Sequence, residues 1–234
     1  MPILSVVLAV YNGERYLGSA LKSILDQTFK DFECIVIDDG STDCTPEILK
    51  EFTDSRLKII SQENKGLTKS LNYGISISRG IFIARMDADD IADLNRFKIQ
   101  LDFLQQSPEV AVCGTLARLI DTQGADIGEY CVPINYRTIR RHLLFHNPFI
   151  HPSVIFRKNI FYEVGGYDET YRYAQDYELW SRIVPAYKTI NIDQYLLKYR
   201  KLDSGITKSK NLKVRLLGIR IRILYVFRLI SGLL

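Results

Sequence analysis

The chain has 234 residues, of which 47% are apolar, and this is enough for one good-sized hydrophobic core with a small appendage. Its net charge of +4 is unevenly placed. Ten Lys or Arg residues against one acid from Lys198 onward contribute +9, which leaves −5 for the residues before it. The sequence shows no internal repeat and no low-complexity linker, so we do not expect a second independent domain.

The cysteine pattern and the first residues indicate a reduced, cytoplasmic protein. No CxxC spacing is present, which disfavours a zinc site or a disulfide framework built from Cys34, Cys44, Cys113 and Cys131. The N-terminal apolar run lacks both the basic segment and the small-residue cleavage pattern of a secretion signal. We therefore predict that this run is the first strand.

Strand-like and helix-like segments alternate through the first half of the chain. Apolar runs typical of buried strands occupy residues 3–10 and 32–37, and further strands are predicted at 57–60 and 81–86. Apolar residues at helical spacing predict helices over 16–25, 45–52 and 67–78. Thr45 is expected to cap the second helix, with Pro46 at its first position. This order predicts an α/β fold with a mostly parallel central sheet, right-handed crossovers and flanking helices.

The second half is less regular. Its pattern predicts strands around a turn over 110–126, a helix over 136–145, a strand at 151–157, a loop at 165–171 and a short helix over 174–184.

Polar clusters follow three of the predicted parallel strands. They occupy residues 11–14, 38–43 and 87–90, each directly after an apolar run. In open parallel sheets, ligands bind beyond the carboxyl ends of the strands. The three clusters therefore predict one site at this edge of the sheet.

The densest of these clusters places Asp87 and Asp89 on either side of the small Ala88. In an extended segment, residues two apart point the same way, so both carboxylates can face one ligand. Their oxygens suit Mg²⁺ or Mn²⁺, and magnesium sites often combine one or two carboxylates with substrate phosphates. The alternative is that the acids cap the following helix, a task for which Asp90 or Asp93 alone would suffice.

Two further carboxylates stand where chemistry is expected. Asp39, at the end of the second strand, could accept a hydrogen bond from a nucleobase or a ribose, or be an ordinary turn residue. Asp176, at the start of the helix over 174–184, could act as a general base for a hydroxyl nucleophile, or be an acid paired with the helix dipole.

Six segments, in order from about residue 3 to 185, carry a resemblance to a known family. They are "SVVLAVYNGERYL", "ILDQTFKDFECIVIDDGSTDCT", "NKGLTKSLNYGISISRGIFIARMDADDI", "HPSVIFRK", "GGYDE" and "AQDYELWSR". Together they resemble the inverting nucleotide-sugar glycosyltransferases of family 2, of the bacterial surface-polysaccharide type, which have the Rossmann-like GT-A fold. The resemblance implies one GT-A domain over 1–200, with its nucleotide-binding half at about 1–115 and its acceptor half at about 116–200.

The resemblance also implies roles for individual residues. Asp176 would be the catalytic base, and Asp89 and Asp87 would hold Mn²⁺ or Mg²⁺ together with the donor diphosphate. The implied contacts to the nucleotide sugar come from Ala9, Tyr11, Glu14, Asp39, Lys65, Asp87 and Ala88. Asn64, Lys65 and Gly66 resemble the segment that closes over the nucleotide. His151, Glu178 and Trp180 are expected near the acceptor, although His151 could equally be a structural histidine.

The implied reaction transfers a sugar from a nucleoside-diphosphate sugar, expected to be a UDP-sugar, to a saccharide or lipid-linked saccharide acceptor. A nucleotidyltransferase that makes activated sugars is a rival, but the N-terminal region has no glycine-rich, basic phosphate loop. The non-enzyme alternative is a membrane-associated saccharide-binding or scaffold protein, which the intact acids Asp39, Asp87, Asp89 and Asp176 disfavour.

The tail over 201–234 combines basic and aliphatic residues. Seven Lys or Arg residues from Lys208 onward interrupt every window of about 20 residues, so a membrane-spanning helix is disfavoured. A basic amphipathic helix on the anionic inner face of the cytoplasmic membrane fits this composition. The alternative is a helix that packs on the body or in a homodimer. Nucleic acid is a poor partner because stacking aromatics are few.

Overall fold

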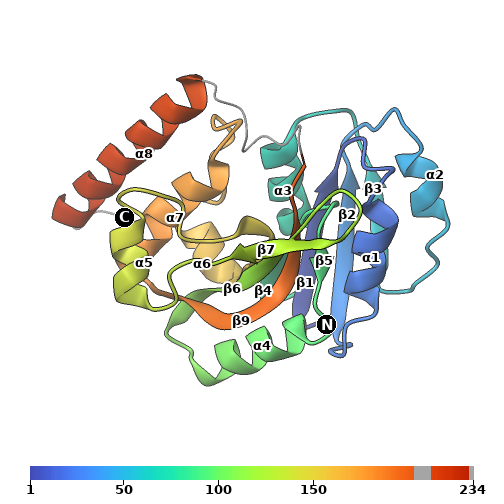
Figure 1. The fold of residues 1–234 in the computed structure, drawn as a ribbon, viewed down its shortest axis with the longest axis horizontal. Helices are drawn as coiled ribbons and strands as arrows, with labels where there is room; N and C mark the ends of the chain where they lie inside the picture. Colours follow the sequence, from blue (N-terminus) through green and yellow to red (C-terminus); the bar gives the residue numbers. More distant parts are fainter. Residues whose placement is uncertain (203–211, 232–234) are drawn as a thin grey trace.

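The computed structural model describes residues 1–202 and 212–231 and shows an α/β fold around one mixed sheet (Figure 1). The strands are β1 (Leu4–Val10), β2 (Phe32–Asp38), β3 (Leu57–Ser61), β4 (Phe82–Met86), β5 (Ile91–Ala92), β6 (Val110–Ile120), β7 (Asp126–Tyr130), β8 (Ile155–Arg157) and β9 (Lys188–Arg200). The helices are α1 (Leu17–Leu25), α2 (Thr45–Lys50), α3 (Leu67–Ser76), α4 (Arg96–Gln106), α5 (Tyr136–His142), α6 (Lys158–Glu163), α7 (Gln175–Ala186) and α8 (Leu212–Ser231).

The predicted parallel half of the sheet is confirmed. Strands β3, β2, β1 and β4 are neighbours in that order, and each adjacent pair is parallel. Every residue of β1, β2 and β4 is buried, as expected for apolar strands covered by helices on both faces. The carboxyl ends of these strands therefore meet at one edge, where the polar clusters follow them.

The second half extends this same sheet. The antiparallel strand β8 joins β4 to β6, β9 lies parallel to β6, and β7 forms the predicted hairpin with β6. The predicted strand at 151–157 is wrong in its first part. Residues His151–Ser153 form a 3₁₀ turn that contains Pro152, which has no N–H to donate to a ladder, and only β8 is a strand. Sequence reasoning did not predict α4, α6, β5 or β9.

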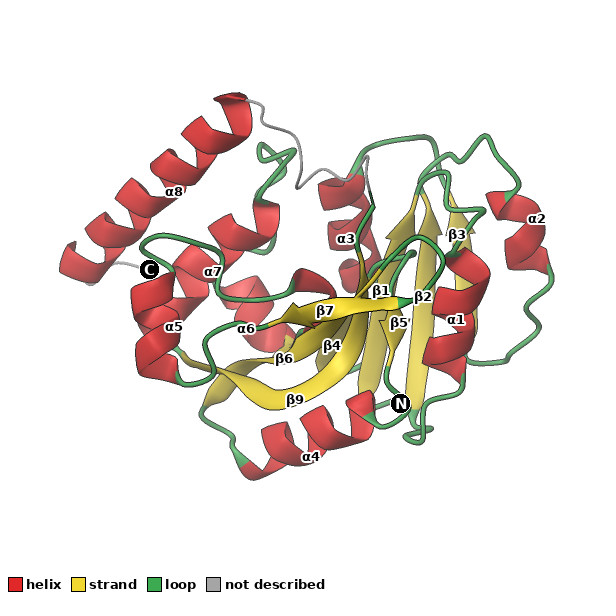
Figure 2. Ribbon diagram, viewed as in Figure 1, coloured by secondary structure: helices red, strands yellow, loops and turns green. Residues whose placement is uncertain are grey.

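Helices cover both faces of the sheet in three layers, as the ribbon coloured by element shows (Figure 2). One core lies under α1, α2 and α4, and the other lies under α3 and α5 to α8. The period of two in β1 divides its side chains between them, since Val7 belongs to one core and Val6 and Leu8 belong to the other.

The start of α2 differs from the prediction by one residue. Thr45 is the first helical residue and Cys44 precedes it as the N-cap, so Pro46 is not at the first position. The Thr45 hydroxyl is buried and accepts a 2.8 Å hydrogen bond from the Gly13 backbone N–H. The side chain therefore supports the turn after β1 and does not cap its own helix.

The predicted helical tail is present as α8, and it packs against the body beside α7 (Figure 1). Ile221 and Tyr225 of α8 are fully buried in the core that contains α7. Within residues 1–202 and 212–231, none of the helices has both the length and the apolar character required to traverse a lipid bilayer. The first part of the tail, residues 203–211, lies outside the described residues.

Candidate functional site

The turns after β1 and β2 are tied together by hydrogen bonds of 2.8–3.0 Å. The bonds are Asn12 N to Ser41 Oγ, Thr42 N to Asn12 Oδ1, Gly13 N to Thr45 Oγ1, Glu14 N to Asp43 Oδ2 and Cys44 N to Glu14 Oε2. Asn12 has a φ of 54°, a conformation that asparagine tolerates better than most residues. The Glu14 carboxylate thus joins the two turns, and it does not line the cavity that lies between the turn after β1 and the acidic cluster.

Asp39 anchors the segment 64–66. Its carboxylate is buried and accepts hydrogen bonds from Gln62 Nε2 at 2.7 Å, Lys65 N at 2.9 Å and Gly66 N at 2.8 Å. A carboxylate offers about four lone-pair sites, so one site on Oδ2 is left for a ligand donor. The structure therefore joins Asp39 to Lys65 through the Lys65 backbone, and the base-reading role of Asp39 stays a prediction.

Gly40 makes this arrangement possible, and we expect Gly40→Ala to destabilise the protein. Gly40 has a φ of +77°, and a Cβ there would lie 2.7 Å from the Asn64 backbone nitrogen. The left-handed conformation alone costs a non-glycine residue roughly 1–2 kcal/mol. Urea unfolding should show a loss of at least about this size. Gly18→Ala is the matched control, because a Cβ there meets no atom within 4 Å and alanine favours the helix; a similar loss in both variants would contradict the argument.

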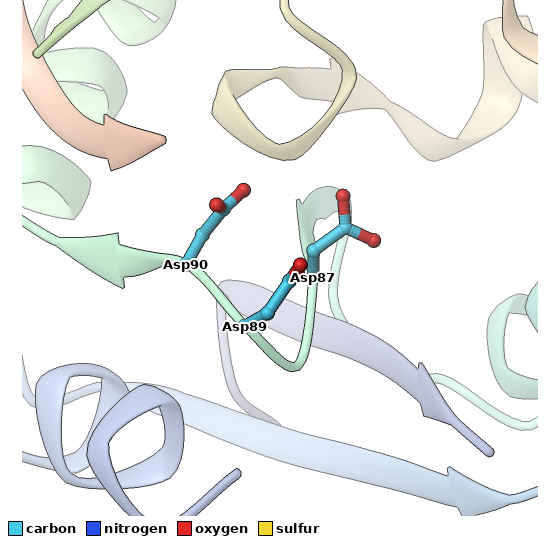
Figure 3. A group of neighbouring side chains, drawn as sticks. All are labelled: Asp87, Asp89 and Asp90. Atoms are coloured by element: carbon cyan, nitrogen blue, oxygen red, sulfur yellow. The ribbon is translucent and has the colours of Figure 1, made fainter. Parts of the chain in front are cut away.

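The acidic cluster lies in a tight turn between β4 and β5 (Figure 3). Asp87, Asp89 and Asp90 each offer a carboxylate oxygen, and these oxygens all lie within 4.8 Å of one another. The expectation of an extended Asp87–Asp89 segment is wrong, because residues 88 and 89 form a turn. The turn brings in Asp90, which the sequence pattern did not place in the metal site.

The charges of this cluster are only partly balanced. Arg85, buried on β4, forms an ion pair with Asp87, which raises the pKa of Arg85 although burial opposes this. Burial first, and the Asp87 charge second, raise the pKa of Asp89 to about 6. The same causes raise the pKa of Asp90 well above its usual range, and its buried Oδ2 has no hydrogen-bond partner. The pairing of Arg85 with Asp87 could have been predicted from the sequence, since residues two apart along a strand point to the same side.

A helix-capping role for the cluster does not fit the geometry. The next helix, α4, begins at Arg96. Just before it, the Asp93 carboxylate accepts a 2.9 Å hydrogen bond from Asn95 N. Asp90 Oδ1 instead accepts a 2.8 Å hydrogen bond from the backbone of Arg200 on β9. The cluster is therefore held away from the helix terminus and faces the strand ends.

A cavity of about 310 Å³ lies between the turn after β1 and the acidic cluster. Five of the predicted nucleotide-sugar or metal residues line it, namely Ala9, Tyr11, Asp87, Ala88 and Asp89. Tyr11 is 53% exposed, so its ring is free to stack on a ligand. The tertiary structure thus brings together residues that are nearly 80 positions apart in the sequence.

A second cavity, of about 620 Å³, shares Asp87 with the first. It contains Asp176 and His151, both expected near the reaction centre, and part of its wall comes from α8. Its aromatic lining residues are Tyr130, Phe145, Phe149, Tyr173, Tyr177 and Tyr199. Aromatic faces beside carboxylates suit a ligand that has both apolar and hydroxyl-bearing surfaces.

Asp176 enters this second cavity from the first turn of α7. Ala174, which precedes it, has a φ of 56°, so the chain turns sharply into the helix. Asp176 Oδ2 accepts a 2.6 Å hydrogen bond from Asn147 Nδ2. Burial raises the pKa of Asp176 above its usual value, and the hydrogen bond from Asn147 opposes that rise. A carboxylate with a raised pKa is a stronger proton acceptor, as a general base requires.

The Asn147 contact predicts an ordered series of pH profiles. A general base acts as the carboxylate, so transfer should fall as pH decreases through the raised pKa of Asp176. Asn147→Ala should move this acid limb to higher pH, and Asn147→Asp should move it further by adding a negative charge. The dependence of kcat/KM on pH, measured for each variant, gives the pH at which transfer falls on the acid side. Asn135→Ala is the control, since Asn135 lies outside the cavity and accepts a 3.1 Å hydrogen bond from a backbone N–H, as Asn147 does. An acid limb that stays at the same pH in both Asn147 variants would refute the assignment of Asp176 as the base.

His151 is held as a neutral ring at the cavity wall. Its Nε2 lies 2.7 Å from Tyr167 Oη, and its ring contacts Trp180 edge-on. Burial, and then the charge of Arg85, lower the pKa of His151 well below its usual value. His151 is therefore a buried structural group that also lines the cavity, and its proximity to an acceptor stays a prediction.

Glu178 and Trp180 lie behind the cavity. Glu178 is buried and paired with Arg182 at 2.6 Å, and Trp180 is fully buried against Phe149. Neither lines the cavity: Trp180 belongs to the hydrophobic core below α7, and the Glu178 carboxylate faces Arg182 and Arg228. We therefore expect Glu178 and Trp180 to influence an acceptor only by fixing the position of α7.

Comparison with known proteins identifies this architecture. The model of glycosyl transferase family 2 matches residues 5–165. The O-antigen biosynthesis glycosyltransferase WbnJ of Escherichia coli is 35% identical over 216 residues, which cover 89% of this chain and 84% of WbnJ. An uncharacterized glycosyltransferase of Haemophilus influenzae is 34% identical over 85% of this chain, which spans 65% of that relative.

Solved structures confirm the predicted fold class. S. aureus TarS 1-349 in complex with UDP-GlcNAc has a TM-score of 0.77 at 20% identity, covering 97% of this chain and 66% of the TarS chain. The mannosyltransferase PcManGT from Pyrobaculum calidifontis, in complex with GDP-Man and Mn²⁺, has a TM-score of 0.74 at 18% identity, covering 97% and 64%. With the family model covering more than half of its length, the chain belongs to glycosyl transferase family 2.

Proposed function

We propose that the chain is a metal-dependent, inverting glycosyltransferase that moves a sugar from a nucleoside-diphosphate sugar to a saccharide or lipid-linked saccharide. The observation that carries this proposal is the position of Asp87, which lines both cavities. The acidic cluster thereby stands between a pocket suited to a nucleotide and a pocket that contains a candidate base. Donor and acceptor would meet at this junction.

The acidic cluster fits a divalent cation. Three oxygen-donor side chains converge, Asp90 Oδ2 is buried without a partner, and burial and mutual repulsion raise the pKa of Asp89 to about 6. Hard oxygen ligands match Mn²⁺ or Mg²⁺. We assign Asp89 and Asp87 as the residues that hold the ion, with Asp90 beside them. When bound, the ion would neutralise the charge that develops on the departing diphosphate.

The side chains then divide the remaining work. Asp176 takes the proton from the acceptor hydroxyl that attacks the anomeric carbon from the face opposite the leaving group, which gives inversion. Asn147 orients the Asp176 carboxylate, and the His151–Tyr167 pair fixes the adjoining wall. On the donor side, the turn over 9–14 and the segment held by Asp39 enclose the nucleotide.

A UDP-sugar is the proposed donor, and the setting is the synthesis of a surface polysaccharide. TarS has been solved with UDP and with UDP-GlcNAc, whereas PcManGT has been solved with GDP-Man and Mn²⁺. WbnJ is named for O-antigen biosynthesis. The nucleotide-sugar complexes support a nucleotide-sugar donor, and WbnJ supports a polysaccharide product. The cytoplasmic side of the membrane is the setting we propose for this reaction.

Calorimetric titration of UDP, GDP and dTDP, each with and without Mn²⁺, tests the proposal directly. We expect one nucleotide to bind in a metal-dependent manner, which would name the donor class. Mg²⁺ in place of Mn²⁺ would show which ion the site prefers. Absence of binding by every nucleotide under all these conditions would contradict the proposal and favour a non-catalytic saccharide-binding protein.

A further inference from the structure

Helix α8 is fixed to the helix that carries the candidate base. Ile221 and Tyr225 are fully buried, and Tyr225 Oη donates a 3.0 Å hydrogen bond to the Arg140 backbone oxygen. Arg228 lies 3.5 Å from the Glu178 carboxylate of α7 and also contacts the Ser181 hydroxyl. The position of α8 is thus coupled to that of Asp176, two residues before Glu178.

The opposite face of α8 is apolar and uncovered. Its large apolar side chains are between 41% and 81% exposed, and they are Leu216, Ile219, Ile223, Val226, Phe227 and Ile230. Their spacing of three, four, three, one and three residues places them on one side of an α-helix. At a rise of 1.5 Å per residue, the row is about 21 Å long. Isolated exposed apolar residues are ordinary, but a continuous row of this kind indicates an interaction surface.

Positive charge borders this outward apolar face. On a helix with 100° per residue, Arg220 projects at one edge of the row and Arg222 at the other. The described helix has no acidic residue. An apolar row between two basic edges is typical of helices that lie in the interface of an anionic membrane. A second copy of the chain would instead bring the same arginines together, and like charges across an interface are unfavourable.

The same helix forms part of the wall of the Asp176 cavity. Gly218, Ile219 and Arg222 line that cavity, and Ile219 belongs to the outward apolar face as well. The mouth of the cavity and the apolar face are therefore adjacent. A surface that covered this face would lie next to the opening through which an acceptor reaches Asp176.

We propose that the outward apolar face of α8 lies in the headgroup region of an anionic membrane and holds the mouth of the Asp176 cavity at the level of that membrane. An acceptor saccharide carried on a membrane lipid would then enter the cavity without leaving the interface. The membrane contact stands on the α8 geometry alone, whereas the acceptor class rests on the proposed function.

Cosedimentation of the full chain with vesicles separates these possibilities. The vesicles contain phosphatidylcholine alone or with about 30% phosphatidylserine. The test variant is Ile223→Ser/Phe227→Ser, which removes two exposed side chains that do not line the cavity. The matched control is Ile81→Ser/Ile127→Ser, which removes two side chains with exposed fractions of 62% and 49% from β4's flank and β7.

We expect the wild type and the control to bind the anionic vesicles, and the α8 variant to bind them at least tenfold more weakly. Binding should also fall with added salt and on neutral vesicles. Equal binding by all three proteins would overturn the proposal. So would a dimer, seen by analytical ultracentrifugation, that is lost in the α8 variant while vesicle binding is absent throughout. Mn²⁺-dependent nucleotide binding should be the same in the α8 variant, so the proposed function is tested separately.

Discussion

Asp176→Asn should lower the rate of sugar transfer by roughly 10²- to 10⁴-fold, the contribution typical of a positioned general base. The amide has nearly the shape of the carboxylate but cannot accept the proton of the attacking hydroxyl. It also removes the charge that accepts the 2.6 Å hydrogen bond from Asn147. Single-turnover transfer with the nucleotide sugar identified by calorimetry measures the effect.

Nucleotide binding should survive this change, because Asp176 lines the larger cavity and not the smaller one beside the turn over 9–14. Asp193→Asn provides the control, since it removes an exposed carboxylate on β9 that lines neither cavity. Its rate should stay close to that of the wild type. A rate for Asp176→Asn within a factor of two of the wild type would remove Asp176 from the mechanism.

Asp89→Asn should abolish the part of nucleotide binding that depends on Mn²⁺. Loss of groups that merely orient metal ligands costs about 10- to 100-fold in metal affinity, so loss of a direct ligand should cost at least that much. Calorimetry of the wild type and the variant, with and without Mn²⁺, measures the difference. Unaltered metal dependence in the variant would place the ion elsewhere.

The pKa of Asp89 adds a check on the same site. Burial and the charge of Asp87 raise this pKa to about 6, so a proton competes with the metal below that pH. Without metal, the folded chain holds this proton more tightly than the unfolded chain, so the contribution of Asp89 to stability falls as pH rises toward 6. Added Mn²⁺ should therefore raise Tm more at pH 7 than at pH 5 in the wild type, and this difference should shrink in Asp89→Asn.

Arg85 explains how the acids coexist in the folded chain. Four acids lie in the seven positions from 87 to 93, and carboxylates so close together repel one another unless a positive charge balances them. The ion pair between Arg85 and Asp87 supplies part of the balance from within the fold. The pKa values of Asp89 and Asp90 remain raised, which leaves the cluster able to gain from a cation.

The sequence by itself determined the parallel half of the fold. Apolar runs and apolar residues at helical spacing specify β1 to β4 and α1 to α3 locally, so period and composition suffice. Of these strands β1, β2 and β4 are buried throughout, whereas β3 lies at the sheet edge with partly exposed side chains. The placement of polar clusters after these strands also predicted the edge at which the site forms. Ala9, Tyr11 and the Asp87–Asp89 segment do line one cavity at this edge, and their roles toward a ligand stay predictions.

The tertiary structure alone decided how the second half joins the sheet and which residues make up the site exactly. Strand β9 is half-exposed and its register with β6 shifts at three points, so it shows no clean alternation in the sequence. Asn147 meets Asp176, and Arg200 meets Asp90, across 29 and 110 residues. Such contacts depend on how the sheet continues past β4, and no local pattern of propensity or hydrophobic period contains that information.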